Sequence, residues 1–93
     1  MLFRSVADGC NAPRIGELPF ETCRALESIV VSEAEVEEAF RVLYREAKLA
    51  VEPAAAVPLA ALLAGRVSAQ EPVVVVSGGN VDPEIASGIL TRR

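Results

Sequence analysis

The chain has 93 residues, 52% of them hydrophobic, which suffices for one small domain with a thin margin of stability. Its 13 acidic and 9 basic residues give a net charge of −4 without a basic stripe, so the composition offers no support for a nucleic-acid partner or an anionic membrane surface. The lack of histidine excludes sites built on that residue, and Cys10 and Cys23 form no Cys-x-x-Cys pair, so no metal site is predicted.

The first part of the chain predicts a loop, a short helix and a short strand. Residues 1–16 show no sustained period and contain turn-forming residues, notably at positions 13–16, so we expect a loop that must lie on some surface, which nothing in this chain obviously offers. Residues 17–27 carry apolar side chains at helical spacing, with Pro19 tolerated in the first turn. Residues 28–31 are typical of a short strand.

The clearest predicted helix covers residues 32–48. Ser32 and Glu35 match a capping box, and the acidic first turn suits the helix dipole. The apolar residues that keep to one face of this helix are Val36, Ala39, Phe40, Leu43, Tyr44 and Ala47. Lys48, the only lysine of the chain, stands at the helix end, where a cation suits the dipole, and is not expected to act as a nucleophile.

The second half of the chain predicts a helix, a buried strand and a closing helix. Residues 55–64 are rich in alanine and leucine, and Gly65 is expected to end that helix. Residues 73–76 are four consecutive valines, a run typical of a strand buried on both faces. Asp82 is then placed to cap a helix over residues 83–90.

The alternation of helices with short strands predicts an α/β fold with parallel strand pairing. A strand as apolar as residues 73–76 needs neighbours on both edges and helices on both faces, which two strands cannot provide. No apolar stretch approaches the roughly 18 residues of a membrane span, and the start of the chain lacks the order of a signal peptide. We therefore interpret the sequence as part of a larger cytoplasmic domain.

A polar turn, Ser77-Gly78-Gly79-Asn80, follows the valine run directly. Ligands of open α/β sheets bind at the carboxyl ends of strands, and adjacent glycines let a backbone come close to a ligand. The same residues also suit a turn chosen only for its left-handed backbone freedom. A second turn, Glu52-Pro53, combines a carboxylate with a proline before a helix, and the presence of both turns favours a binding site.

Five motifs in register carry a resemblance to a known family. They are Ala7-Asp8-Gly9, Gly16-Glu17-Leu18-Pro19-Phe20, Val31-Ser32-Glu33-Ala34-Glu35, Glu52-Pro53-Ala54-Ala55-Ala56 and the run from Val73 to Asp82. In this order the motifs resemble the C-terminal part of the pyridoxal-phosphate-dependent serine/threonine dehydratases, the group that holds threonine ammonia-lyase, hydroxyaspartate dehydratase and serine racemase.

The resemblance implies the second type of pyridoxal-phosphate fold, of which this chain would be a partial three-layer sandwich with a parallel sheet. It also implies a cofactor-binding role for the two turns. The Ser77 hydroxyl would bond to the pyridine nitrogen, Gly78 and Gly79 would let the backbone lie against the ring, Asn80 would brace the turn, and Glu52 would lie near the same end of the cofactor. In the serine racemase branch, the positions of Lys48 and Asn80 belong to a nucleotide effector site.

Departures from the family pattern limit what the chain is expected to do alone. The Schiff-base lysine and the glycine-rich phosphate loop of the family belong to segments before the matched region. Ala55 replaces a glycine of the Glu-Pro turn, and Pro58 replaces a helix-favouring residue. No catalytic residue is therefore assigned to this chain.

Residues 1–93 are accordingly predicted to be the C-terminal part of a catalytic domain. The complete enzyme would remove water from a serine- or threonine-like substrate and deaminate the product to a keto acid. It would need an N-terminal portion or a homo-oligomer partner, and the chain alone would be inactive. The alternative interpretation is a non-catalytic α/β interaction module or a non-functional remnant.

Overall fold

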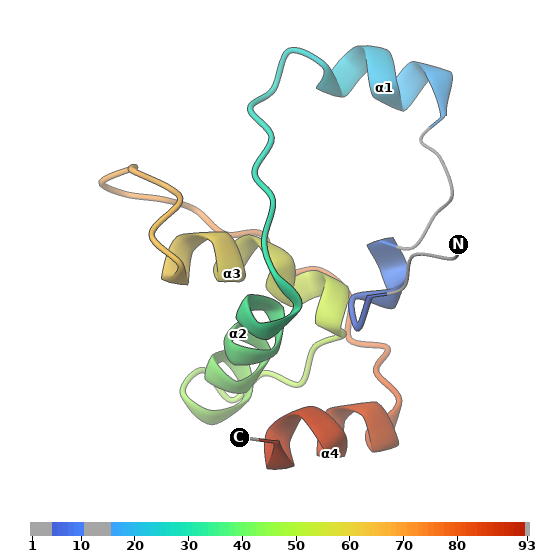
Figure 1. Ribbon diagram of the computed structural model, residues 1–93, viewed down its shortest axis with the longest axis vertical. Coiled ribbons are helices and arrows are strands. Elements are labelled where there is room, and N and C mark those ends of the chain that lie inside the picture. The colour runs from blue at the N-terminus through green and yellow to red at the C-terminus, as the bar shows by residue number, and fades with distance from the viewer. Residues whose placement is uncertain (1–4, 11–15, 93) are drawn as a thin grey trace.

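The computed structural model describes residues 5–10 and 16–92, which form a group of helices and two long extended segments (Figure 1). In chain order the elements are η1 (Asp8–Cys10), α1 (Glu17–Cys23), α2 (Glu33–Arg45), η2 (Pro53–Ala56), α3 (Val57–Leu63) and α4 (Pro83–Thr91). Among these helices, none is long and apolar enough to cross a membrane. Of the turn predicted at residues 13–16, residues 13–15 lie outside the described part of the chain.

The predicted α/β fold, a partial three-layer sandwich with a parallel sheet, is wrong for this structure, because the described residues contain helices and no strand. The segments 28–31 and 73–76 are extended but make no ladder of backbone hydrogen bonds. Val30, Val73 and Val75 are 83%, 90% and 70% exposed, so the valine run is not buried on both faces. A strand forms only when a neighbouring segment pairs with its backbone groups, and these two segments do not pair with each other.

Helix α2 begins as its sequence predicts. The Ser32 hydroxyl accepts a hydrogen bond from the backbone N–H of Glu35 (3.2 Å), and the backbone N–H of Ser32 donates to the Glu35 carboxylate (2.7 Å). This confirms the capping box, which satisfies two of the backbone donors that a helix start leaves open. The helix ends at Arg45 and not at residue 48, because Lys48 adopts a left-handed backbone with φ 60°.

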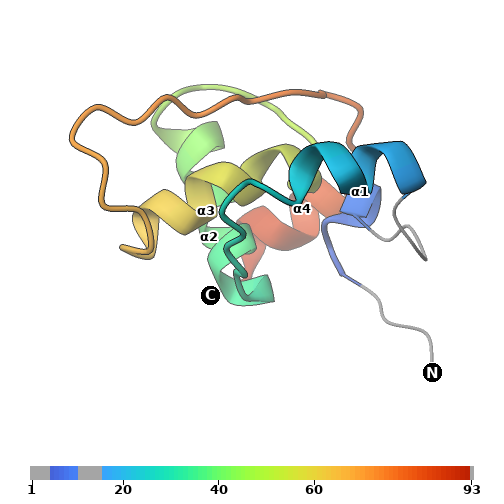
Figure 2. The ribbon, with the colours of Figure 1, turned by 90° about the horizontal axis from the view of Figure 1, so that it is seen from above.

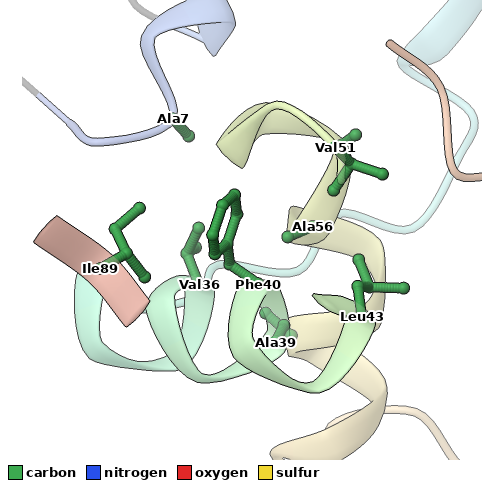
Figure 3. Close-up of a cluster of buried hydrophobic side chains, with 10 residues drawn as sticks. Ala7, Val36, Ala39, Phe40, Leu43, Val51, Ala56 and Ile89 are labelled. Atoms are coloured by element: carbon green, nitrogen blue, oxygen red, sulfur yellow. The ribbon is translucent and has the colours of Figure 1, made fainter. Parts of the chain in front are cut away.

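The core lies on one face of α2 (Figure 3). Four residues of that face, Val36, Ala39, Phe40 and Leu43, are buried and point toward Ile89 of α4 and the chain before and within η2. Phe40 and Ile89 are the largest fully buried side chains among the described residues. The rest of the predicted apolar face, at positions 44 and 47, is exposed, and position 47 lies beyond the end of α2.

The described residues of the N-terminal loop pack against other parts of the chain. Ala7 is 2% exposed and belongs to the core, and the backbone N–H of Val6 donates to the Glu33 carboxylate (2.8 Å) at the start of α2. Gly9 packs on η2 so closely that a Cβ there would lie 3.1 Å from the Cβ of Ala54. The described part of the loop therefore rests on the start of α2 and on η2.

The predicted helix over residues 55–64 is divided into a 3-10 turn, η2, and the α-helix α3. Pro58 occupies the first turn of α3, where the missing N–H of proline costs no helical hydrogen bond. Gly65 ends α3 as predicted, with φ 74°, and the backbone N–H of Arg66 donates to the Ala61 carbonyl (3.0 Å). These features form a Schellman motif, which requires a residue that tolerates a left-handed backbone.

Helix α1 stands apart from the other helices, joined to α2 by a turn at residues 24–26 and the extended residues 27–31 (Figure 1). It is shorter than predicted, ending at Cys23, and none of its residues is buried. Leu18 and Phe20 are 75% and 51% exposed. The second extended segment, from Arg66 to Asp82, runs along one side of the helical group (Figure 2). The apolar face of α1 thus has no partner within the described residues.

Arg66, at the start of the second extended segment, connects this segment to the end of the first one and to α2. The guanidinium of Arg66 donates to the Val30 carbonyl (2.9 Å) and pairs with the Glu35 carboxylate. The backbone N–H of Ser32 and then the Arg66 guanidinium lower the pKa of Glu35 below its ordinary value, against a desolvation that raises it. A carboxylate whose pKa is lowered on folding contributes stability above its unfolded pKa and loses that contribution as the pH falls.

We therefore expect the free energy of unfolding to decrease as the pH drops below about 5, through the ordinary glutamate pKa of about 4.3 and on to the lower folded value. Denaturant titrations over this range should show a shallower decrease for Glu35→Gln than for the parent. Glu46→Gln, at an exposed glutamate for which the described structure has no ion pair, is the matched control. Parallel curves for Glu35→Gln and the parent would contradict the assignment.

Candidate functional site

The structure brings together the two turns that the sequence singles out. The backbone N–H of Glu52 donates to the Gly78 carbonyl (3.3 Å). The Glu52 carboxylate also lies against the Cα of Gly78, since a Cβ built on Gly78 would overlap Glu52 Oε1 and lie 2.7 Å from Cδ. Gly78 has φ 80°, a left-handed backbone that glycine adopts without strain. Glu52 and Gly78, which are distant in sequence, therefore form one contact.

A cavity of about 630 Å³ opens beside this contact. Its walls come from the turn before η2, from the segment leading into α4 and from the chain around η1, and include Glu52, Asn80 and Asp82. Of the five predicted site residues, Glu52 and Asn80 line the cavity, whereas Ser77, Gly78 and Gly79 are exposed next to it. The cavity is thus lined by two of the five predicted residues, and the other three precede Asn80 in the same turn without lining it.

The wall on the α4 side begins with a capped helix. The Asp82 carboxylate accepts a hydrogen bond from the backbone N–H of Glu84 (2.8 Å), and Pro83 occupies the first helical position. Both features confirm the predicted helix start. The helix runs to Thr91, one residue beyond the predicted end. Asp82 is therefore engaged by its own helix at the rim of the cavity.

Two arginines of α2 bind the C-terminal end of α4. The sequence predicted no role for either of them. Arg41 Nε donates to the Ile89 carbonyl and Arg45 Nη2 to the Leu90 carbonyl, each at 2.9 Å. The last carbonyls of a helix lack partners within it, so these bonds satisfy groups that α4 leaves open. The guanidinium of Arg41 also pairs with Glu38 at 3.2 Å. Together with the burial of Ile89, these contacts fix the position of α4 and thereby one wall of the cavity.

The residues on either side of Gly78 differ from it. For the Ser77 hydroxyl, no hydrogen-bond partner is present within residues 5–10 and 16–92. Gly79 has no left-handed backbone, and a Cβ there would meet the Ala50 carbonyl oxygen at 3.6 Å, an ordinary contact. The described chain therefore gives a steric reason for glycine at position 78 and none at position 79.

Lys48 is engaged at the end of α2 and does not face the cavity. Its Nζ donates to the Arg45 carbonyl (2.6 Å), which agrees with the predicted helix-end cation. It lines a separate hollow of about 420 Å³ with Tyr44, Arg45 and Ala50. Lys48 and Asn80, the two positions of the expected effector site, thus line different cavities.

Metal-binding and disulfide chemistry receive no support in the described part of the chain. No group of three or more acidic or cysteine side chains there could hold a metal ion. Cys10 and Cys23 are both exposed and free. The candidate site therefore consists of the two turns, the Glu52–Gly78 contact and the adjoining cavity.

The family model of pyridoxal-phosphate-dependent enzymes matches residues 2–79, a range that includes both turns of the site except Asn80. The chain belongs to this family. The resemblance predicted from the five motifs is thereby confirmed.

Individual relatives in the pyridoxal-phosphate-dependent family include the catabolic L-threonine dehydratases TdcB of Staphylococcus aureus strains N315 and USA300. The chain is 40% and 39% identical to them over 93 residues. Each match covers 92% of this chain and 27% of the relative. The chain thus spans about a quarter of the length of these family members.

Proposed function

We propose that the chain is the C-terminal part of the catalytic domain of a pyridoxal-phosphate-dependent threonine or serine dehydratase, and that it supplies the pyridine-ring end of the cofactor site. The observation that supports this proposal is the contact between Glu52 and Gly78, which joins the Glu52 turn to the Ser77-Gly78-Gly79-Asn80 turn. The identity to two threonine dehydratases supports the choice of substrate class.

The residues of the two turns fit a flat, nitrogen-containing ring. The Ser77 hydroxyl is exposed, with no partner among the described residues, so it is available to bond to a ring nitrogen. Gly79 leaves the turn without a Cβ where the chain itself does not require glycine. Asn80, the last residue of this turn, lines the cavity, and in the proposal it braces the turn.

Pyridoxal phosphate, when bound, supplies an electron sink for the bond changes at the amino-acid Cα. In the proposal, the Ser77 hydroxyl binds the pyridine nitrogen and leaves it less protonated than a carboxylate would. This milder setting favours loss of the β-hydroxyl group of serine or threonine as water over competing reactions. The hydrolysis of the resulting enamine would then release ammonia and a keto acid.

We assign the remaining functions of the site to residues outside these 93. The only lysine of the chain, Lys48, is bound to the Arg45 carbonyl and lines a different hollow. Covalent attachment of the cofactor and phosphate binding therefore require an N-terminal portion or a partner subunit. The exposed apolar side chains of the extended segments and of α1, such as Val73, Val75 and Leu18, offer a surface for that polypeptide.

The test joins the chain to the N-terminal portion of a catabolic threonine dehydratase and measures keto acid formed from threonine and from serine. We expect activity and visible cofactor absorbance in the joined protein, and neither in the 93-residue chain alone. A borohydride-trapped adduct on Lys48 of the lone chain, together with keto acid production, would contradict the proposal.

The exposed valines also support the alternative of a non-catalytic interaction module, because an unpaired extended segment is a site where another chain can bind. The joined protein distinguishes the two functions. A stably folded joined protein that binds no cofactor would favour the interaction module. Cofactor binding and turnover in the joined protein would favour the dehydratase.

A further inference from the structure

Glu52 has a different place in the site from the one that family resemblance suggests. Its carboxylate is not directed at the cavity alone but packs along the Cα of Gly78, where Oε1, Cδ and Cγ occupy the space that a Cβ would need. The same two residues are joined by the hydrogen bond from the Glu52 N–H to the Gly78 carbonyl. The side chain and the backbone of Glu52 thus act on one glycine.

The two residues differ in how firmly the core holds them. Glu52 precedes Pro53 and Ala55, which are buried, and its carbonyl accepts a hydrogen bond from the backbone N–H of Ala55 (2.9 Å). Gly78 lies in an extended segment whose neighbours are exposed and lack a hydrogen-bonded ladder. Glu52 is therefore the fixed partner of the contact, and Gly78 is the partner whose position the contact determines.

We infer that Glu52 is a positioning residue, which fixes the turn carrying Ser77 through its contact with Gly78, and that it is not itself a ligand of the cofactor. This inference rests on the proposed function for its consequence in the complete enzyme. It divides the two glycines by role. Gly78 admits the Glu52 side chain, whereas a Cβ on Gly79 would make only an ordinary contact with the Ala50 carbonyl oxygen.

The shape of the Glu52 side chain matters for this role more than its charge. Glu52→Gln keeps the same number of heavy atoms and the same packing against Gly78, and so preserves the turn. Glu52→Ala removes the atoms that touch Gly78 and releases the turn. If Glu52 instead bound the cofactor through its charge, the glutamine and alanine variants would be equally harmful.

The first measurement uses the 93-residue chain without cofactor and records the backbone amide NMR signals of Ser77, Gly78 and Gly79. We expect Glu52→Gln to leave them in place and Glu52→Ala to move them. Gly78→Ala should displace the Glu52 side chain, so it should perturb the signals less in the Glu52→Ala background than in the parent. Unmoved signals of Ser77 and Gly78 in Glu52→Ala would overturn the inference, whatever the chain binds.

The second measurement uses the joined protein and the dissociation constant of pyridoxal phosphate. We expect Glu52→Gln to bind as the parent does and Glu52→Ala to bind about tenfold more weakly. Equal weakening in the glutamine and alanine variants would overturn the positioning role. Failure of the joined parent to bind cofactor would reject the proposed function, while the signals of the lone chain would still decide the role of Glu52.

Discussion

Replacement of Ser77 by alanine in the joined protein is expected to lower turnover or cofactor affinity by about one to two orders of magnitude. If the Ser77 hydroxyl bonds to the pyridine nitrogen as proposed, the variant leaves a buried acceptor unpaired, at a cost of about 1–3 kcal/mol. We expect the effect only when the cofactor is bound, because Ser77 is exposed in the chain and has no hydrogen-bond partner among the described residues. Steady-state turnover of threonine and cofactor titration measure it.

Ser77→Asp provides a second, qualitative readout. A carboxylate beside the pyridine nitrogen would favour its protonation, so elimination should decrease relative to side reactions at the same carbon. Ser68→Ala, at an exposed serine away from the site, and Lys48→Ala are the controls and should leave turnover close to that of the parent. If Ser77→Ala also behaves like the parent, Ser77 is only a turn residue and the cofactor assignment is wrong.

Phe40→Ala is expected to have the largest effect on stability. Phe40 is 2% exposed at the centre of the core, where deletion of an aromatic ring costs about 3–5 kcal/mol through lost burial and the cavity left behind. A domain of this length has a total stability of about 5–14 kcal/mol, so this one change removes a large part of it. The midpoint of denaturant unfolding, followed by circular dichroism, measures the loss.

Phe20→Ala is the matched control for this prediction. Phe20 is 51% exposed on α1, and its truncation should change the free energy of unfolding by no more than about 0.5 kcal/mol. The same substitution therefore separates a phenylalanine in the core from one on the isolated helix. Similar shifts for the two variants would show that α1 packs on the other helices in solution.

The features of the fold that depend on a few adjacent residues could be predicted from the sequence. The capping box of Ser32 and Glu35, the start of α4 at Asp82 and the end of α3 at Gly65 are confirmed, because each needs only local hydrogen bonds or a local backbone conformation. The strand at residues 73–76 could not be settled in this way. Its valines favour an extended backbone, but a strand also needs a neighbour, and the described chain offers none.

The candidate site shows the same division between local and distant information. The order of motifs pointed to Glu52 and to the turn after the valines, and the structure brings Glu52 and Gly78 into contact. The direction of the Glu52 side chain depends on how η2 packs, which no local pattern encodes. Arg41 and Arg45 were missed because two arginines four residues apart resemble a solvated helix face, and only the placement of α4 shows that they bind its carbonyls.

The hydrogen bonds from α2 to the end of α4 influence which helices unfold together. Because these guanidinium groups and the buried Ile89 connect the two helices, α4 cannot leave without breaking contacts that α2 also needs. We therefore expect the two helices to form one cooperative unit, whose amide hydrogens exchange with solvent in a shared opening event. Helix α1 has no buried residue and opens independently, with little free energy. The chain thus combines a slowly exchanging centre with an arm that folds and unfolds on its own.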